Sequence, residues 1–322
     1  PRNWGPPALN FSGGIARLST GIYSHDRDIW HAVSYSSTWI RGHHGFTYGA
    51  DYRYQQFNLF SQRDPRGSFT FNGAATGNDF EDFRQGIPRT SSIAYGNADK
   101  YFRQWFANGF ISDDWKVRPS ITLTLGVRWE YEAPIVEKYG RLVNLDIDPN
   151  FASATPTIAT PSDSLVRTDK TGFEPRLGLA WRPRATSSLI VRAGYGLYRD
   201  TTVYRSIADQ MAQQAPLSRS LSVQNTPENP LTLADGFKES PTVIATTFAV
   251  DPDFRVGTAQ NWTLSIQQDL PAALQVTMSY LGVKGTHVPQ RILPNTYPRG
   301  AGIPCVECPP GFAYLMSGGS SN

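Results

Sequence analysis

The sequence predicts an all-β fold: part of an antiparallel transmembrane β-barrel with long extracellular loops and one or two short loop helices. Three observations predict it. Segments of roughly ten residues alternate between apolar and polar side chains, aromatic residues stand near the ends of these segments, and short connections alternate with long ones. Because side chains alternate across a strand, each segment has one apolar face for lipid and one polar face for a wet lumen.

The clearest strand covers residues 121–131, where every odd position is apolar and the even positions are polar, charged or glycine. Its length matches the roughly 9–11 residues that a tilted strand needs to cross a bilayer. Trp129 and Tyr131 end the apolar face, so we expect them in the outer aromatic girdle. A half-buried strand of a soluble sandwich has the same alternation, so the prediction depends on repetition.

The alternation does repeat, in segments that lie on both sides of this strand. They are residues 29–40, 46–55, 101–117, 176–182, 188–197, 261–267 and 274–280. The segment 101–117 is the least regular, with aromatic residues on both faces. A further strand is expected over residues 8–18, which gives about nine strands.

The connections between these segments indicate the topology. Short turns are predicted at residues 41–44, 118–120, 183–187 and 270–272, and long segments at 57–98, 133–172 and 200–259. Barrels of this kind have short periplasmic turns and longer extracellular loops. Structureless loops of such length are uncommon in compact soluble domains.

The long segments contain some predicted local order. Residues 79–86 read as a short helix, capped by Asn78 or Asp79 and ended by Gly86. Residues 203–214 are a second helix candidate, and the tract 155–162, rich in Pro, Thr and Ser, is expected to be mobile.

Composition excludes several other classes. Charged residues make up 18% of the chain and the net charge is only +3, without a basic block, which gives little support to nucleic-acid binding. No apolar run approaches the roughly 18 residues that a membrane-spanning helix needs. The first residues do not form a signal peptide and the last form a Ser/Gly tract. We therefore expect residues 1–322 to be a segment of a longer barrel protein.

Candidate reactive groups give no sign of an enzyme, a metal or a cofactor. Asp113 and Asp114 are adjacent in a strand, so their carboxylates point to opposite faces and do not converge. The pair His43 and His44 is expected in a solvated turn. Cys305 and Cys308 form the one cysteine pair; a small disulfide in an exported loop is the preferred reading, with a redox motif or half of a zinc site as alternatives.

Charged residues on the polar faces are candidates for selecting a charged solute, although lumen charges are ordinary in barrels. They are Arg128, Glu130, Glu132, Arg176, Arg182 and Arg192. The long segment 200–259 offers aromatic anchors among polar groups, so it is the predicted recognition loop. Its candidate substrate-binding residues are Tyr204, Arg205, Arg219 and Phe237.

Several motifs, in order and spacing, resemble Oar-like TonB-dependent receptors across roughly residues 30–320. They are Gly67-Ser-Phe-Thr-Phe-Asn-Gly73 followed by Thr76-Gly-Asn-Asp-Phe80; Asp113-Asp-Trp-Lys-Val-Arg-Pro119 running into Leu123-Thr-Leu-Gly-Val-Arg128; Pro175-Arg-Leu-Gly-Leu-Ala-Trp181; Val191-Arg-Ala-Gly-Tyr-Gly-Leu-Tyr198; Gln260-Asn-Trp-Thr-Leu-Ser-Ile266; and Ser279-Tyr-Leu-Gly-Val-Lys-Gly285. Each motif alone is weak, but the ordered set is specific.

The resemblance implies a barrel of about 22 strands around a plug in the outer membrane of a Gram-negative-type bacterium. It implies energised transport of a peptide, glycan or chelate. The implied partners are membrane lipid, lipopolysaccharide, and the TonB complex acting through an N-terminal region. Plug, N-terminal domain and closing strands are absent from the matched motifs. Two other functions stay open: an adhesin or structural surface barrel without transport, and a soluble carbohydrate-binding β domain.

Overall fold

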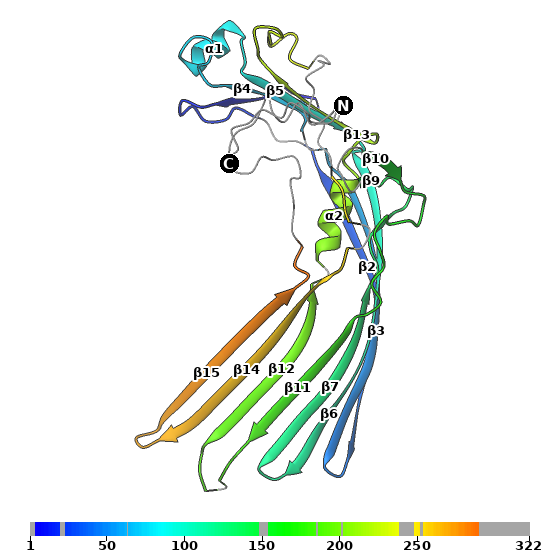
Figure 1. Cartoon of the computed structure of the whole chain (residues 1–322), viewed down its shortest axis with the longest axis vertical. Helices are drawn as coiled ribbons and strands as arrows, with labels where there is room; N and C mark the ends of the chain where they lie inside the picture. Colours follow the sequence, from blue (N-terminus) through cyan, green and yellow to red (C-terminus); the bar gives the residue numbers. More distant parts are fainter. Residues whose placement is uncertain are drawn as a thin grey trace.

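A computed structural model describes residues 4–19, 23–62, 64–147, 154–184, 186–200, 202–237, 248–251 and 254–289. Its main element is a nine-stranded sheet in which eight long antiparallel strands form a curved wall, in the order β15-β14-β12-β11-β7-β6-β3-β2 (Figure 1). The strands are β2 (His25–Arg41), β3 (His44–Phe60), β6 (Asp99–Arg118), β7 (Ile121–Glu132), β11 (Phe173–Trp181), β12 (Ile190–Asp200), β14 (Gly257–Leu270) and β15 (Leu274–Thr286). The two-residue β8 (Val136–Glu137) pairs with β6.

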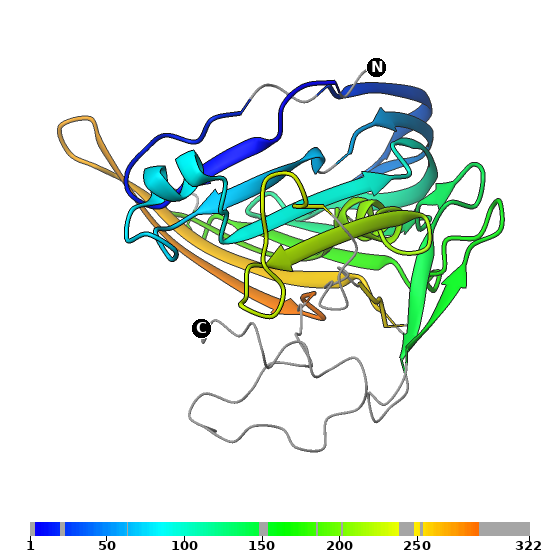
Figure 2. The same cartoon turned by 90° about the horizontal axis from the view of Figure 1, so that it is seen from above.

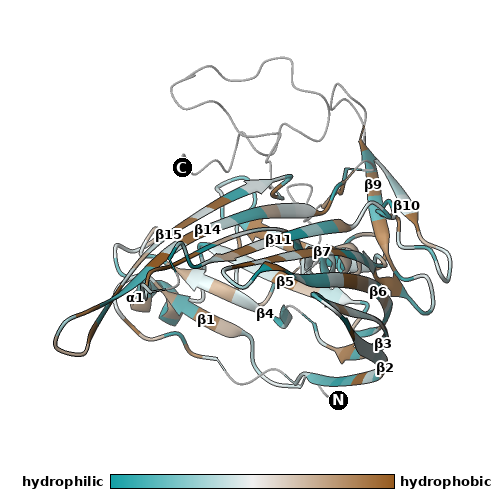
Figure 3. Cartoon of the chain, turned by 90° about the horizontal axis from the view of Figure 1, so that it is seen from below, coloured by the Kyte–Doolittle hydropathy of each residue, from teal (hydrophilic) through white to brown (hydrophobic). Residues whose placement is uncertain are grey.

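The cross-strand register aligns the apolar face of each strand with the apolar face of its neighbour along the wall. One continuous row is apolar, because directly paired residues share a face: Leu123, Leu179, Ala193, Leu264 and Tyr280. The adjacent row, one residue along each strand, points to the opposite face. From β7 to β14 it is small or polar, with Thr124, Gly178, Gly194 and Thr263, and it ends at Leu281 on β15. Figure 3 shows the resulting alternation of hydrophobic and hydrophilic residues along the strands. The prediction of an all-β, partial barrel is confirmed, and the wall strands alternate between apolar and polar residues as predicted.

The four short connections lie together at one end of the wall, as predicted (Figure 1). One of the two two-residue connections joins β2 to β3 through Gly42 and His43, with Gly42 at φ 61°. That positive φ explains the glycine, since a Cβ there strains the backbone. The wall is open: within the described residues its edge strands β2 and β15 do not pair with each other.

The long connections at the other end are folded, and they contain strands as well as the two predicted helices. Three of their segments and the N-terminal segment build a four-stranded sheet, in the order β1 (Ala8–Phe11), β4 (Asp64–Phe71), β5 (Thr90–Gly96) and β13 (Ser218–Gln224). A separate hairpin consists of β9 (Val143–Ile147) and β10 (Ala154–Ile158). Loops of this length become ordered here because strands from distant segments satisfy each other's backbone groups.

Two sequence predictions change as a result. Residues 8–18 do not form a wall strand: only β1 is a strand, it pairs in parallel with β4, and Leu9 and Leu18 form a single antiparallel bridge. The tract 155–162 is not simply a mobile loop, because Thr155 to Ile158 pair with β9. In both cases local composition did not reveal the partner strand.

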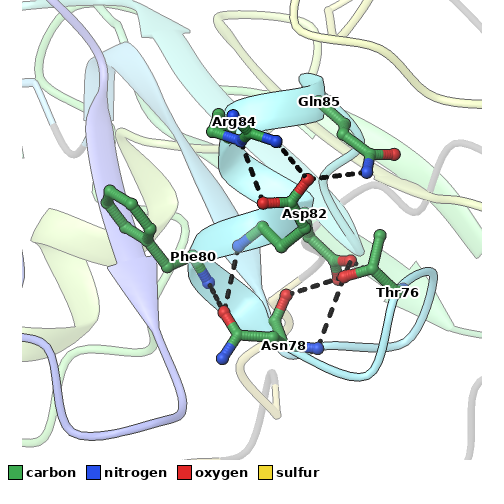
Figure 4. Close-up of polar contacts among 7 residues, drawn as sticks. Thr76, Asn78, Phe80, Asp82, Arg84 and Gln85 are labelled. Atoms are coloured by element: carbon green, nitrogen blue, oxygen red, sulfur yellow. Dashed lines mark hydrogen bonds and ion pairs between the residues drawn. The ribbon is translucent and has the colours of Figure 1, made fainter.

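Two short helices complete the layer, and neither has the length and apolar character of a membrane-spanning helix. Helix α1 (Asp79–Gln85) begins as predicted, with the Asn78 side chain accepting bonds from the amides of Phe80 and Glu81 (Figure 4). It ends at Gly86, which has φ 72°. Helix α2 (Val203–Met211) is shorter than the expected 203–214.

A hydrophobic core joins α2 to the wall at this end of the molecule. Buried side chains of α2 pack with Phe57 of β3 and Phe102 of β6. The loop that follows β7 contributes Ile135 and Leu142. Phe102 therefore lies on the lumen face yet is apolar, which accounts for the aromatic residues on both faces of β6.

Candidate functional site: the layer over the lumen mouth

The candidate site is the layer that the long connections form at the end of the wall opposite the short turns. Seen from above, the small sheet and α1 arch across from one side, and α2 lies inside the curve of the wall (Figure 2). The β9–β10 hairpin projects away from the wall on its other side (Figures 1 and 2). Any solute that enters the lumen from this end meets the layer first.

Helix α2 stacks on the lumen face of the wall, and the segment after it bonds to the β9–β10 hairpin. The Arg205 guanidinium lies 3.4 Å from the centre of the Phe57 ring and 5.8 Å from that of Phe102. Burial lowers the pKa of Arg205, and the Asp209 carboxylate opposes that shift. Beyond the helix, the Gln214 side chain donates to the Val143 carbonyl at 2.5 Å.

The four predicted binding residues fall into two groups. Tyr204 and Arg205 belong to the core of α2; Tyr204 is only 2% exposed, and burial raises the pKa of its phenol to about 12. Arg219 is exposed on β13, paired with Tyr95 across the small sheet. Phe237 packs on Phe69 of β4, with ring centres 4.9 Å apart. Tyr204 therefore serves packing, and Arg219 is the candidate that a solute can reach.

The lumen face of the wall carries a charged network below this layer. Arg128 pairs with Glu130 at 3.6 Å and Arg176 with Glu174 at 3.2 Å, and β7–β11 register places Glu174 opposite Arg128. Glu174 is 1% exposed, and its Oε1 has no hydrogen-bond partner among the described atoms. The sequence analysis named Arg128, Glu130 and Arg176 singly and missed Glu174; the register joins all four into one network.

The other predicted lumen charges lie elsewhere. Glu132 accepts a bond from the Gln104 side chain at 2.8 Å, and Arg192 donates to Gln267 at 3.0 Å. Arg182 is exposed beside a short turn. They do not converge on one solute-sized site.

An aromatic stack on the same face was missed at the sequence level. Phe106 of β6 stacks on Trp30 of β2, with ring centres 5.5 Å apart, and the Arg53 guanidinium lies 5.1 Å from the Phe106 ring. The ring centre of Phe110, four residues further along β6 on the same face, lies 5.9 Å from the Arg128 guanidinium. The signal was the presence of phenylalanine at even positions of residues 101–117, where polar residues were expected.

The adjacent carboxylates Asp113 and Asp114 point apart, as predicted. Asp114 accepts a bond from the Thr124 hydroxyl at 2.6 Å, and Asp113 bonds to His44 at 2.7 Å. His44 is therefore not a solvated turn residue, which corrects the prediction. It is the first residue of β3, and its ring stacks between Phe46 and Trp115.

The best-defined cavities in the described part of the layer are small. Two of them have about 10 Å³ each, which is room for about one water molecule. Among the described residues no group of three or more His, Cys, Asp or Glu is placed to hold a metal ion. Cys305 and Cys308 lie outside the described residues.

Comparison with known proteins decides the family. The family model described as "Outer membrane beta barrel domain" matches residues 1–316. The chain belongs to this outer membrane β-barrel family. Its location is therefore the outer membrane, and its curved sheet is a section of barrel wall. None of the curated proteins matches the chain.

Two solved structures are similar to this outer membrane barrel section. The outer membrane transporter YddB from Escherichia coli shares 12% identity with a TM-score of 0.46, over 85% of this chain and 28% of that chain. The ferric-catecholate import receptor Fiu from E. coli shares 9% identity with a TM-score of 0.35, over 83% of this chain and 36% of that chain. The chain thus spans about a third of the length of these proteins.

Proposed function

We propose that this outer membrane β-barrel section is the wall and mouth of an Oar-like TonB-dependent receptor, which captures a solute outside the cell and moves it inward with energy supplied through TonB. The observation that carries the proposal is the folded layer: long connections from distant parts of the chain assemble into one packed structure over the lumen. A barrel that only anchors itself in the membrane does not need such a layer.

The open wall supports the same proposal. Unpaired backbone groups at a sheet edge cost several kcal/mol each in lipid, so β2 and β15 need further strands beside them. Eight gently curved strands that do not close belong to a wide barrel. Wide transporter barrels of about 22 strands hold a plug rather than an open channel. The motif resemblance to Oar-like receptors agrees with this size.

The capture surface that we propose is the exposed face of the layer, with the lumen network below it as the next contact. Arg219 is the exposed cation of the small sheet among the predicted residues. Aromatic and guanidinium groups line the lumen face below the layer, at Trp30, Phe106 and Arg53. Such groups suit a peptide, a glycan or an anionic chelate.

Removal of the connection that supplies α2 and β13 to the layer is the experiment that tests the proposal. Asp200 and Gly257 are direct cross-strand partners, so a short Gly/Ser turn in place of residues 201–256 joins β12 to β14 without moving the wall. The matched control shortens the β9–β10 hairpin, which projects away from the lumen. Both variants are made in the complete receptor, and outer-membrane abundance is measured alongside uptake of candidate peptides, glycans and chelates.

We expect the first variant to insert but lose uptake, and the hairpin variant to keep it. A charge reversal, Arg219→Glu, adds a test that leaves the core of the layer intact, and it should weaken capture of anionic solutes selectively. Normal uptake without residues 201–256 would show that α2, β13 and the rest of this connection are not needed for recognition. Unchanged uptake in cells without TonB would show a passive barrel instead.

A further inference from the structure

A second surface lies on the lipid side of the wall, away from the lumen. We call it the basic–tyrosine cluster: Tyr101, Lys138, Tyr139 and Arg141. Phe102 points into the core beside α2, so its neighbour Tyr101 on β6 points to the opposite, lipid-side face. The segment that contains β8 turns back along β6 and places the other three residues beside Tyr101.

The four side chains form one contact group. The Arg141 guanidinium lies 5.0 Å from the Tyr139 ring centre and 5.7 Å from that of Tyr101. The Lys138 ammonium lies 5.2 Å from the Tyr139 ring centre, and the two tyrosine rings meet edge to face at 5.4 Å. Tyr139 is 53% exposed, Lys138 is exposed and the Arg141 side chain is partly exposed, so an outside partner can reach both cations and the Tyr139 phenol.

A buried carboxylate holds the cluster in place. Glu137 is fully buried, and its oxygens accept bonds from the backbone amides of Tyr101 at 3.0 Å, Tyr139 at 2.8 Å and Arg141 at 2.9 Å. Because the Glu137 carboxylate accepts these three amide bonds, it orients the segment rather than neutralising the charges of Lys138 and Arg141. Its contact with the Arg141 side chain is longer, at 3.8 Å. The cluster is therefore preorganised, which reduces the entropic cost of binding.

The position of the cluster relative to the membrane points to its partner. Trp105, which packs on Tyr131 with ring centres 4.5 Å apart, marks the aromatic girdle on the same face of β6. From Trp105 to Tyr101 the strand advances about 13 Å, or about 9 Å along the membrane normal at a tilt near 45°. That height is the headgroup region of the outer leaflet, just above the hydrocarbon.

We propose that the basic–tyrosine cluster binds the phosphorylated sugar headgroup of an outer-leaflet glycolipid. Lysine and arginine supply charge-assisted hydrogen bonds to phosphate, and the tyrosine hydroxyls supply bonds to sugar. Arg103, on the same face of β6, adds a further cation, although its guanidinium already donates to Asn58 at 2.9 Å. The proposal requires only the outer-membrane location and stands whether or not the barrel transports a solute.

The test uses the complete, delipidated receptor in detergent and measures binding to a lipid A-type glycolipid in mixed micelles. In the double variant Lys138→Gln/Arg141→Gln, removal of two cations near an anionic surface should weaken binding about thirty-fold. The control variant Arg118→Gln/Arg182→Gln removes the same charge from exposed positions at the short-turn end and should bind normally. The charge-preserving variant Lys138→Arg/Arg141→Lys should keep most of the affinity, which separates charge from folding.

Two further measurements distinguish a glycolipid phosphate from free inorganic phosphate as the bound group. The same glycolipid without its phosphates should bind as weakly to the wild type as the phosphorylated form binds to the double variant. Inorganic phosphate at the glycolipid concentration should not compete. Full competition by inorganic phosphate, or equal affinity in the double and control variants, would overturn the glycolipid site.

Discussion

Replacement of Leu264 by arginine tests which face of the wall meets lipid. Leu264 is 44% exposed on the apolar row, and its cross-strand partners are Ala193 and Tyr280, so a new guanidinium finds no carboxylate opposite. Leu125 is a poorer choice because it lies opposite Asp113, which would pair with an introduced arginine and mask the cost.

The expected magnitude follows from the depth of the residue. Leu264 is six residues from Leu270, the last residue of β14. At about 3.4 Å per residue and a tilt near 40°, it lies about 16 Å above the strand end, close to the centre of an apolar band about 25 Å tall. Arginine at the midplane costs about 2–4 kcal/mol, whereas Leu270→Arg at the strand end should cost about 0–1 kcal/mol.

The assay is reversible denaturant unfolding of the complete receptor in lipid vesicles. Thr263→Arg is the matched control: it is adjacent in sequence, but its partner Gly194 is on the lumen row, where water solvates the charge. We expect Leu264→Arg to lower the free energy of unfolding most and Thr263→Arg to lower it least. If Thr263→Arg were as costly as Leu264→Arg, the assignment of faces would be wrong.

Three other predictions concern topology and the layer. In a cysteine-free background, an impermeant thiol reagent on intact cells should label Glu228→Cys in the layer and not Thr186→Cys at a short turn; the reverse pattern would mean an inverted barrel. Asn78→Ala should destabilise α1 by about 1 kcal/mol, seen as faster hydrogen exchange of Phe80, while Asn78→Asp should not. Because burial raises the pKa of Tyr204 to about 12, its contribution to stability is complete below about pH 10 and is lost towards pH 12. Tyr204→Phe should remove that part of the pH dependence, and an unchanged slope would contradict it.

The candidate site was only partly predictable from the sequence. From the sequence, Tyr204 and Arg205 are equally good candidates for binding a solute. In the structure, α2 buries Tyr204 in the core and stacks Arg205 on Phe57. The pairing of Glu174 with Arg128 depends on the β7–β11 register across a connection of forty residues. Alternation assigns a face to each of these side chains, but it does not say which ones meet.

The sequence by itself determined the wall: strand positions, the two faces, the short turns and the caps of α1. These depend on local physics, since a period of two, a positive φ at glycine and a side-chain cap involve residues close together in the chain. Only the tertiary structure decided the layer and the surfaces around it. The small sheet pairs β5 with β13 and the basic–tyrosine cluster sets Tyr101 beside Arg141, and such contacts arise when distant segments satisfy each other's backbone and bury each other's apolar side chains.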